Sequence, residues 1–246
     1  MKSSAVLVFC LPFCSLVFAE SPRFGSVSPN DRVSIVSEGE MPGGVPPGVR
    51  ASKKNLVKRD VDGVSFLGDD EGLIDGLERT VEAIGRVKGQ IRSKGLDDSI
   101  RNEKLFGLVF DPAEIKLTLP MAAFKEGNLV GAKPSGTFKN GLWTGITRFY
   151  RLEDGALVEI VETDLSAVRG RLYMVPESIN TEINGKPAIA AALRNAAGRE
   201  IRQVVWVHGP KAFEFRLLKP SLSKKGEGDA GKKNYDAISM ARSLTR

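Results

Sequence analysis

The chain has 246 residues, a formal net charge of +6, two cysteines and one histidine. Both cysteines lie in the first nineteen residues, so the rest of the chain can form neither a disulfide scaffold nor the usual cysteine- or histidine-rich zinc sites. The positive charge is concentrated in residues 219–246, with seven lysines and arginines against three acidic residues, which argues against a nucleic-acid-binding face in the remainder.

Residues 1–19, MKSSAVLVFCLPFCSLVFA, have the layout of a secretory signal peptide that ends at the small residue Ala19. The apolar stretch is short for a membrane span, and Pro12 interrupts it. A retained membrane anchor and lipidation at Cys14 are the alternatives. Leu11-Pro12-Phe13 lacks the small residues that a lipoprotein signal places before its cysteine. We therefore expect an exported protein, periplasmic or secreted and most plausibly bacterial, with no stable membrane span after cleavage.

Residues 20–69 are rich in Ser, Gly and Pro, with MPGGVPPGV at their centre. Gly and Pro at this density break both helices and strands. We predict a flexible leader that contains one short strand at 32–36. Asp60-Val61-Asp62-Gly63 resembles only the beginning of a calcium loop and lacks the closing glutamate, so we interpret it as a polar turn.

Residues 70–94 change to helical spacing. Acidic residues open this segment and basic residues close it, which matches the helix dipole. The apolar positions fall on one narrow stripe: Ile74, Leu77, Val81, Ile84 and Ile91. This pattern predicts an amphipathic helix at the N-terminus of the folded domain, packed on a sheet. A helix that binds a partner is the alternative.

From residue 104 to 218 the apolar period becomes two. Strands are predicted at 115–119, 143–152, 156–163, 171–175, 181–183 and 188–194, and in two runs on either side of 208–210. Short turn sequences join them, which favours antiparallel pairing of neighbours, and there is no room for crossover helices. The predicted fold is therefore an α+β domain over 70–218. It consists of an antiparallel β-meander of six to eight strands with the amphipathic helix packed on it.

Residues 219–246 are predicted to be a basic flexible tail, in which 235–244 is compatible with a short amphipathic helix. Residues 226–231 match the glycine pattern of dinucleotide-binding loops. That motif needs a strand before it and a second strand after it, and the sequence provides neither. We expect no cofactor.

His208 lies in HGPK between two strand-like runs, so we interpret it as the exposed tip of a hairpin. No G-x-S-x-G motif accompanies it, and no catalytic residue can be assigned. Nor do we expect a metal site. We expect the carboxylates in the central strands to be solvated strand edges and not a catalytic pair: Glu153, Asp154, Glu159, Glu162 and Asp164.

The aromatic residues of the strongest strands are the candidate ligand or partner face: Trp206, Phe213, Phe215 and Phe149. Val204 shares a strand face with Trp206, whereas Val205 and Val207 point the other way, so this strand is apolar on both faces. Such a strand is either buried on both sides or lines a cavity. The alternative is that these aromatic residues only form the core.

These observations predict an exported, non-enzymatic binding module that contacts another envelope protein through its sheet or its helix. The alternative is a carrier that holds a hydrophobic ligand on the sheet face. A hydrolase is the third hypothesis and the weakest, because no set of nucleophile, base and metal can be assembled.

Overall fold

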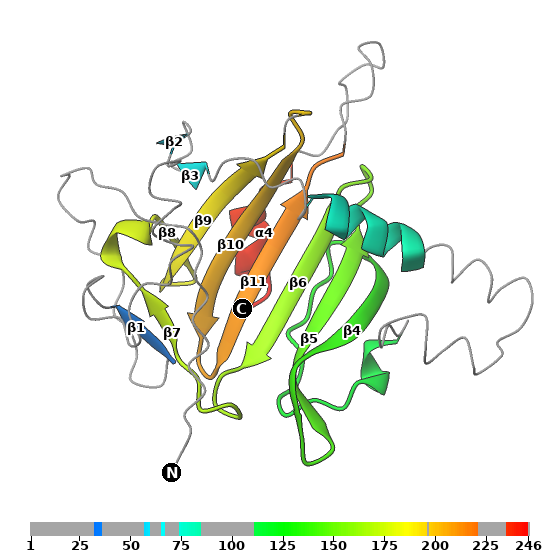
Figure 1. Cartoon of the computed structure of the whole chain (residues 1–246), viewed down its shortest axis with the longest axis vertical. Coiled ribbons are helices and arrows are strands. Elements are labelled where there is room, and N and C mark those ends of the chain that lie inside the picture. The colour runs from blue at the N-terminus through cyan, green and yellow to red at the C-terminus, as the bar shows by residue number, and fades with distance from the viewer. Residues whose placement is uncertain are drawn as a thin grey trace, which may run out of the picture.

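The computed structural model describes residues 32–35, 57–59, 65–66, 74–84, 111–195, 197–220 and 235–245 (Figure 1). The predicted signal peptide and most of the predicted leader lie outside these residues. The described chain forms a mostly antiparallel β-sheet with few helices, which confirms that part of the prediction. No helix in the described ranges is long and apolar enough to cross a membrane.

The long strands are β4 (Asn128–Lys139), β5 (Leu142–Arg151), β6 (Leu157–Asp164), β9 (Lys186–Arg194), β10 (Glu200–His208) and β11 (Lys211–Leu218). The short strands are β1 (Val33–Ile35), β2 (Val57–Arg59), β3 (Ser65–Phe66), β7 (Leu172–Met174) and β8 (Thr181–Ile183). The helices are one at 74–84, the 3-10 turns η3 (Pro112–Glu114) and η4 (Pro176–Ser178), and α4 (Ala237–Ser243).

The sheet is not the single meander that the sequence predicts. Its strand order is β2-β3-β9-β10-β11-β6-β5-β4, with β8 also paired to β9. It therefore consists of two meanders, β4-β5-β6 and β9-β10-β11, joined by antiparallel pairing of β6 with β11. Turn sequences specify pairing only between neighbours, so they could not predict this non-local join. Two parallel pairings, β1 with β7 and β3 with β9, were also not predicted.

The predicted tight turns are confirmed. Asn184 and Gly185 have φ values of 49° and 75° and connect β8 to β9 in the left-handed conformation that a two-residue hairpin requires. Gly209 and Pro210 connect β10 to β11. The predicted strand at 115–119 is wrong, because this segment follows η3 and makes only an isolated bridge from Leu117 to Trp143.

Strand β4 was not predicted. Its sequence, NLVGAKPSGTFK, contains a proline and two glycines, which disguise the alternation of a strand.

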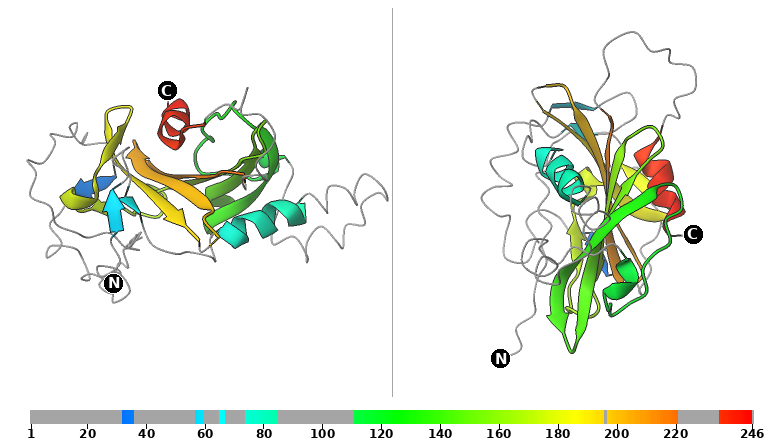
Figure 2. Two further views of the ribbon diagram at one scale, coloured as in Figure 1. Left: turned by 90° about the horizontal axis from the view of Figure 1, so that it is seen from above. Right: turned by 90° about the vertical axis from the view of Figure 1, so that its right-hand side faces the viewer.

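The sheet has two faces, which we name by what covers them. The α4 face carries Ile160, Val204, Trp206, Phe213 and Phe215, and helix α4 packs on it. The β7 face carries Val205, Val207 and Phe149. One end of the β7 face packs against the apolar stripe of helix 74–84, and the other end packs against residues of β1 and β7. Figure 2 shows α4 and helix 74–84 on opposite sides of the sheet.

Helix 74–84 is shorter than the predicted segment at 70–94, and an N-terminal helix of that length is not supported. Four of its five predicted apolar positions are buried: Ile74, Leu77, Val81 and Ile84. The fifth, Ile91, lies outside the described residues.

Two predicted arms contribute to the fold. Strands β1, β2 and β3 come from the predicted leader and pair with β7 and β9. Helix α4 comes from the predicted tail; the Asp236 carboxylate caps it by accepting hydrogen bonds from the backbone N–H groups of Ile238 and Ser239. Met240 and Leu244 are buried in the cluster on the α4 face, so the folded domain extends beyond the predicted boundary at residue 218. The apolar spacing of this segment therefore predicts its structure better than its basic composition does.

Candidate functional site

The four aromatic residues singled out by the sequence do not form one face. Trp206, Phe213 and Phe215 lie together on the α4 face, where the Trp206 and Phe213 rings stack with centroids 5.0 Å apart. Phe149 lies on the opposite face, in the cluster with helix 74–84. Phe149 pairs with Glu159, and Glu159 pairs in turn with Arg216, which is one position out of phase with Phe215. All four side chains are buried, so in the described chain they act as core residues.

His208 ends β10 and pairs with Lys211 across the predicted hairpin. The tip is held in place and not freely exposed. The Gly209 carbonyl accepts a hydrogen bond from the Arg32 N–H at 3.2 Å, and the Pro210 carbonyl accepts one from the Leu165 N–H at 2.9 Å. The His208 side chain is partly buried, and its Nδ1 has no hydrogen-bond partner among the described residues. Nothing in this geometry prepares His208 as a general base.

The exposed feature of the sheet is the tip of the hairpin formed by β4 and β5. We define the β4–β5 tip as residues 136–143. Phe138 is 58% exposed. Among the described residues, Ile35, at 40%, is the only other large hydrophobic residue that is exposed. Trp143 is the cross-strand neighbour of Phe138, and the two rings lie 5.0 Å apart at an interplanar angle of 47°. Figure 1 shows this hairpin projecting past the end of β6.

The sequence contains a signal for this tip that our sequence reasoning did not use. Asn140 and Gly141, with φ values of 52° and 79°, form the tight turn, and an aromatic residue lies on either side. An Asn-Gly pair between strands is a strong hairpin signal.

The tip is braced at its base by residues 115–124, which we call the strap. Past the end of β6, the Trp143 N–H donates to the Lys116 carbonyl at 2.8 Å, and the Thr118 N–H donates to the Trp143 carbonyl at 3.0 Å. Within the hairpin, the Thr137 N–H donates to Thr144 Oγ1 at 2.8 Å. Ile115 of the strap packs with Ala132 and Ile146 beneath. The aromatic pair is therefore carried by a hairpin that is fixed on both strands.

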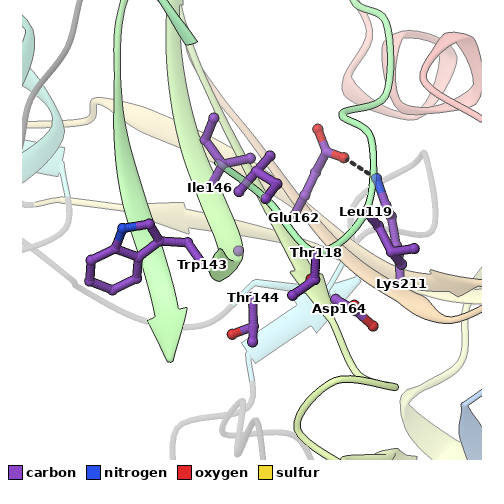
Figure 3. Close-up of a pocket in the computed structure, with 10 residues that line it drawn as sticks. Thr118, Leu119, Trp143, Thr144, Ile146, Glu162, Asp164 and Lys211 are labelled. Carbon is purple, nitrogen blue, oxygen red and sulfur yellow. Dashed lines mark hydrogen bonds and ion pairs between the residues drawn. The ribbon is translucent and has the colours of Figure 1, made fainter. Parts of the chain in front are cut away.

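A small hollow lies between the strap and strands β5, β6 and β11 (Figure 3). Its lining includes Thr118, Trp143, Thr144, Asp164 and Lys211, and its volume is about 10 Å³. This is room for about one water molecule and not for an organic ligand. Burial acts to raise the pKa of Asp164, but hydrogen bonds from Ser166 and from the Ala167 N–H outweigh it and lower that pKa.

Glu162 borders this hollow and organises a buried polar cluster on the α4 face, which we call the Glu162 cluster. Its Oε1 pairs with the Arg148 guanidinium, and its Oε2 pairs with Lys211 Nζ at 3.0 Å and accepts the Ala122 N–H at 2.9 Å. Arg148 also donates to the Tyr150 hydroxyl at 2.9 Å, and Lys211 donates to the Pro120 carbonyl of the strap. Burial raises the pKa of Tyr150, against the opposing charge of Arg148. One carboxylate thus pairs with a cation from each neighbouring strand and anchors the strap.

A second buried polar cluster lies on the β7 face, and we call it the Arg216 cluster. Arg216 pairs with Glu159 at 2.6 Å and with Glu214, which also accepts from the Gln203 amide. Burial raises the pKa of Glu214, and Arg216 opposes it only in part. Burial acts to lower the pKa of Arg216, but the two carboxylates outweigh it and the net direction is upward.

The two clusters correct the prediction that the carboxylates of the central strands are solvated edges. Glu159, Glu162 and Asp164 are 8%, 3% and 5% exposed. Glu162 and Glu159 can be buried because β11 runs beside β6 and supplies Lys211 and Arg216 as their partners. Asp164 instead accepts hydrogen bonds from Ser166 and from the Ala167 N–H.

A larger hollow of about 210 Å³ lies between helix 74–84 and the neighbouring strand ends. Half of its ten lining residues are charged: Glu78, Glu82, Arg151, Arg199 and Lys219. Arg199 and Glu78 are joined by two hydrogen bonds. A polar lining of this kind does not suit a hydrophobic ligand.

Among the described residues, no group of three His, Cys, Asp or Glu side chains is placed to hold a metal ion. No protein-family model, curated protein or solved structure matches the chain significantly. Its function must therefore be inferred from the geometry of its own residues.

Proposed function

We propose that the protein is an exported, non-enzymatic binding module that contacts another envelope protein through the β4–β5 tip of its sheet. The observation that carries this proposal is Phe138, which is 58% exposed and lies with its ring tilted against that of Trp143 on a braced hairpin. Large aromatic side chains supply much of the binding energy in protein interfaces. A contact that is already rigid loses little entropy on binding. Export itself is proposed from residues 1–19.

The contact is made by side chains and not by addition of a strand. Within the described residues β4 is the last strand of the sheet, so one of its edges is free of strand partners. Pro134 lacks an N–H group, and the pairing with β5 shifts register between Leu129 and Gly131 and between Ser135 and Phe138. Proline and bulges interrupt a strand edge and protect it against pairing with another chain. Phe138, at the end of β4, remains available.

The internal pairing of the charged residues supports a non-enzymatic role. A catalytic acid or base must reach a substrate. Glu162 is already bound by two cations and a backbone N–H, and the hollow beside it has a volume of only about 10 Å³. The alternative, a carrier of a hydrophobic ligand, requires an apolar cavity. The hollow beside the strap is water-sized, and the hollow beside helix 74–84 is lined largely by charged residues, so neither of them supports it.

The proposal is tested with Phe138→Ser in the full-length protein produced in its own cells. Ile35→Ser is the matched control, because among the residues that the structure describes Ile35 is the other exposed large hydrophobic residue, and it lies on β1. Proteins captured with each variant are quantified by mass spectrometry, and unfolding curves establish that both variants fold. We expect at least one exported protein to fall by about tenfold with Phe138→Ser and to be retained with Ile35→Ser. Identical sets of captured proteins would contradict the proposal.

A further inference from the structure

The β4–β5 hairpin has an unbalanced charge. Residues 128–151 contain two lysines and two arginines and no aspartate or glutamate. Arg148 is neutralised by Glu162, and Lys133 lies over the Phe149 ring at 5.6 Å from its centroid. Lys139 is exposed at the tip. The surface of the hairpin is therefore basic as well as aromatic.

Two exposed lysines adjoin the aromatic pair along the backbone. Lys139 follows Phe138 directly in β4, and the carbonyl of Lys116 in the strap accepts the Trp143 N–H. Both side chains are exposed, and within the described part of the chain neither forms an ion pair. An exposed ring with unpaired cations close by in the fold matches the composition of protein-binding sites, which combine an aromatic centre with a polar rim.

We infer that the β4–β5 tip recognises an acidic segment of its partner protein, with an apolar side chain of that segment against the Phe138 ring. This inference rests on the proposed function. Complementary charges at a rim contribute specificity and rate of association, and the central aromatic contact holds the complex together. Lys116 and Lys139 would therefore select the partner, and Phe138 would anchor it.

An anionic membrane would also attract the lysines, but the tip is poorly suited to inserting into one. A single acyl chain gives only marginal membrane binding, and one exposed phenyl ring offers less apolar area than that. A partner that contributes its own apolar side chain can use Phe138 fully. The observations favour a protein segment over a lipid surface.

The test places the photoreactive residue p-benzoylphenylalanine at position 138 of the full-length protein in its native cells and identifies the cross-linked segment. Lys116→Glu and Lys139→Glu are combined on this background. Lys125→Glu is the control, because Lys125 is exposed and lies just before the other end of β4. We expect the cross-linked segment to be an acidic segment of a protein. The double charge reversal should lower the cross-linking yield roughly tenfold, and Lys125→Glu should leave it unchanged.

The outcomes separate the two proposals. Cross-linking to a neutral or basic protein segment, with a yield that the double reversal does not change, would overturn the inference and leave the proposed function standing. Absence of any protein cross-link at position 138 would overturn both. Both would also be overturned if the purified protein co-sedimented with phosphatidylglycerol vesicles in a Phe138-dependent manner and position 138 cross-linked to lipid.

Discussion

The Glu162 cluster and the Arg216 cluster lie on opposite faces of the same sheet and use the same two strands, β6 and β11, with their charges inverted. On the α4 face, one carboxylate holds two cations, Arg148 and Lys211. On the β7 face, one guanidinium holds two carboxylates, Glu159 and Glu214. Each cluster therefore has an unbalanced formal charge, positive in the first and negative in the second.

This difference determines how each cluster can respond to protons. A buried excess of negative charge is relieved when a carboxylate binds a proton, and the raised pKa of Glu214, caused by its burial, is a sign of that tendency. A buried guanidinium keeps its charge, so a buried excess of positive charge is not relieved when the pH falls. Variants that break the two clusters should therefore differ in how their stability depends on pH.

The largest effect is expected from Glu162→Ala. This change leaves Arg148, whose side chain is 5% exposed, without a carboxylate partner, and it removes the acceptor for Lys211 and for the strap. Loss of one partner from a buried pair costs about 3–5 kcal/mol. Urea unfolding at neutral pH measures the cost. The deficit should persist toward acid pH, because a guanidinium keeps its charge there. A cost near zero would mean that the cluster is held by packing alone.

Arg216→Met should have the next largest effect. It leaves Glu159 and Glu214 together without a cation, but the Arg216 side chain is 19% exposed, so we expect a smaller cost of about 2–3 kcal/mol at neutral pH. Burial raises the pKa of Glu214 and Arg216 opposes this in part, so without Arg216 the pKa of Glu214 rises further in the folded state. The stability that Glu214 contributes is then retained below its ordinary pKa and lost as pH rises. The deficit should therefore shrink as pH falls, unlike that of Glu162→Ala. Parallel unfolding curves of the two variants across pH test this difference directly.

The sequence predicts the hairpins of this fold because their causes are local. Asn184-Gly185 and Gly209-Pro210 are turn sequences, and each connects the strands on either side of it. The join between β6 and β11 has no local cause. The ion pair between Glu159 and Arg216 spans 57 residues. Alternation correctly places Glu159 and Glu162 on opposite faces, but burial of both depends on cations from this distant strand.

The candidate site shows a similar division. The Asn140-Gly141 turn with Phe138 and Trp143 around it can be recognised in the sequence. The exposure of Phe138 cannot, because it depends on β5 continuing past the end of β6 and on the strap pairing with Trp143 there. The four aromatic residues selected from the sequence lie in long strands that are covered on both faces of the sheet, and for that reason they are buried.

Glu214→Gln sharpens the comparison without removing a side chain. A glutamine at this position keeps an oxygen that can accept from Gln203 and Arg216, and it removes the charge. The pKa of Glu214 is raised above its ordinary value of 4.5 in the folded protein. Its contribution to stability is therefore complete below pH 4.5 and is lost as pH rises through the folded-state pKa.

The Glu214→Gln variant lacks that loss, so it should gain stability relative to the unmodified protein as pH rises, by at most about 1.4 kcal/mol per pH unit. Burial acts to raise the pKa values of Asp164, Glu200 and Asp236, but hydrogen bonds outweigh it and lower them, so these groups destabilise both proteins at acid pH. The difference between the two unfolding free energies removes this shared background. A difference that stays constant from pH 4 to pH 8 would contradict the prediction.

The smallest effect is expected from His208→Ala, which tests whether His208 belongs to the Glu162 cluster. His208 pairs with Lys211 in the backbone register, yet its Nδ1 has no partner among the described residues, and it contributes nothing to the bonds of Glu162. The hairpin tip is held by the carbonyls of Gly209 and Pro210, which His208→Ala leaves in place. We therefore expect His208→Ala to change the unfolding free energy by no more than about 0.5 kcal/mol. Chemical denaturation at neutral pH measures it. A larger loss would show that the His208 side chain, and not the backbone carbonyls of Gly209 and Pro210 alone, holds the hairpin.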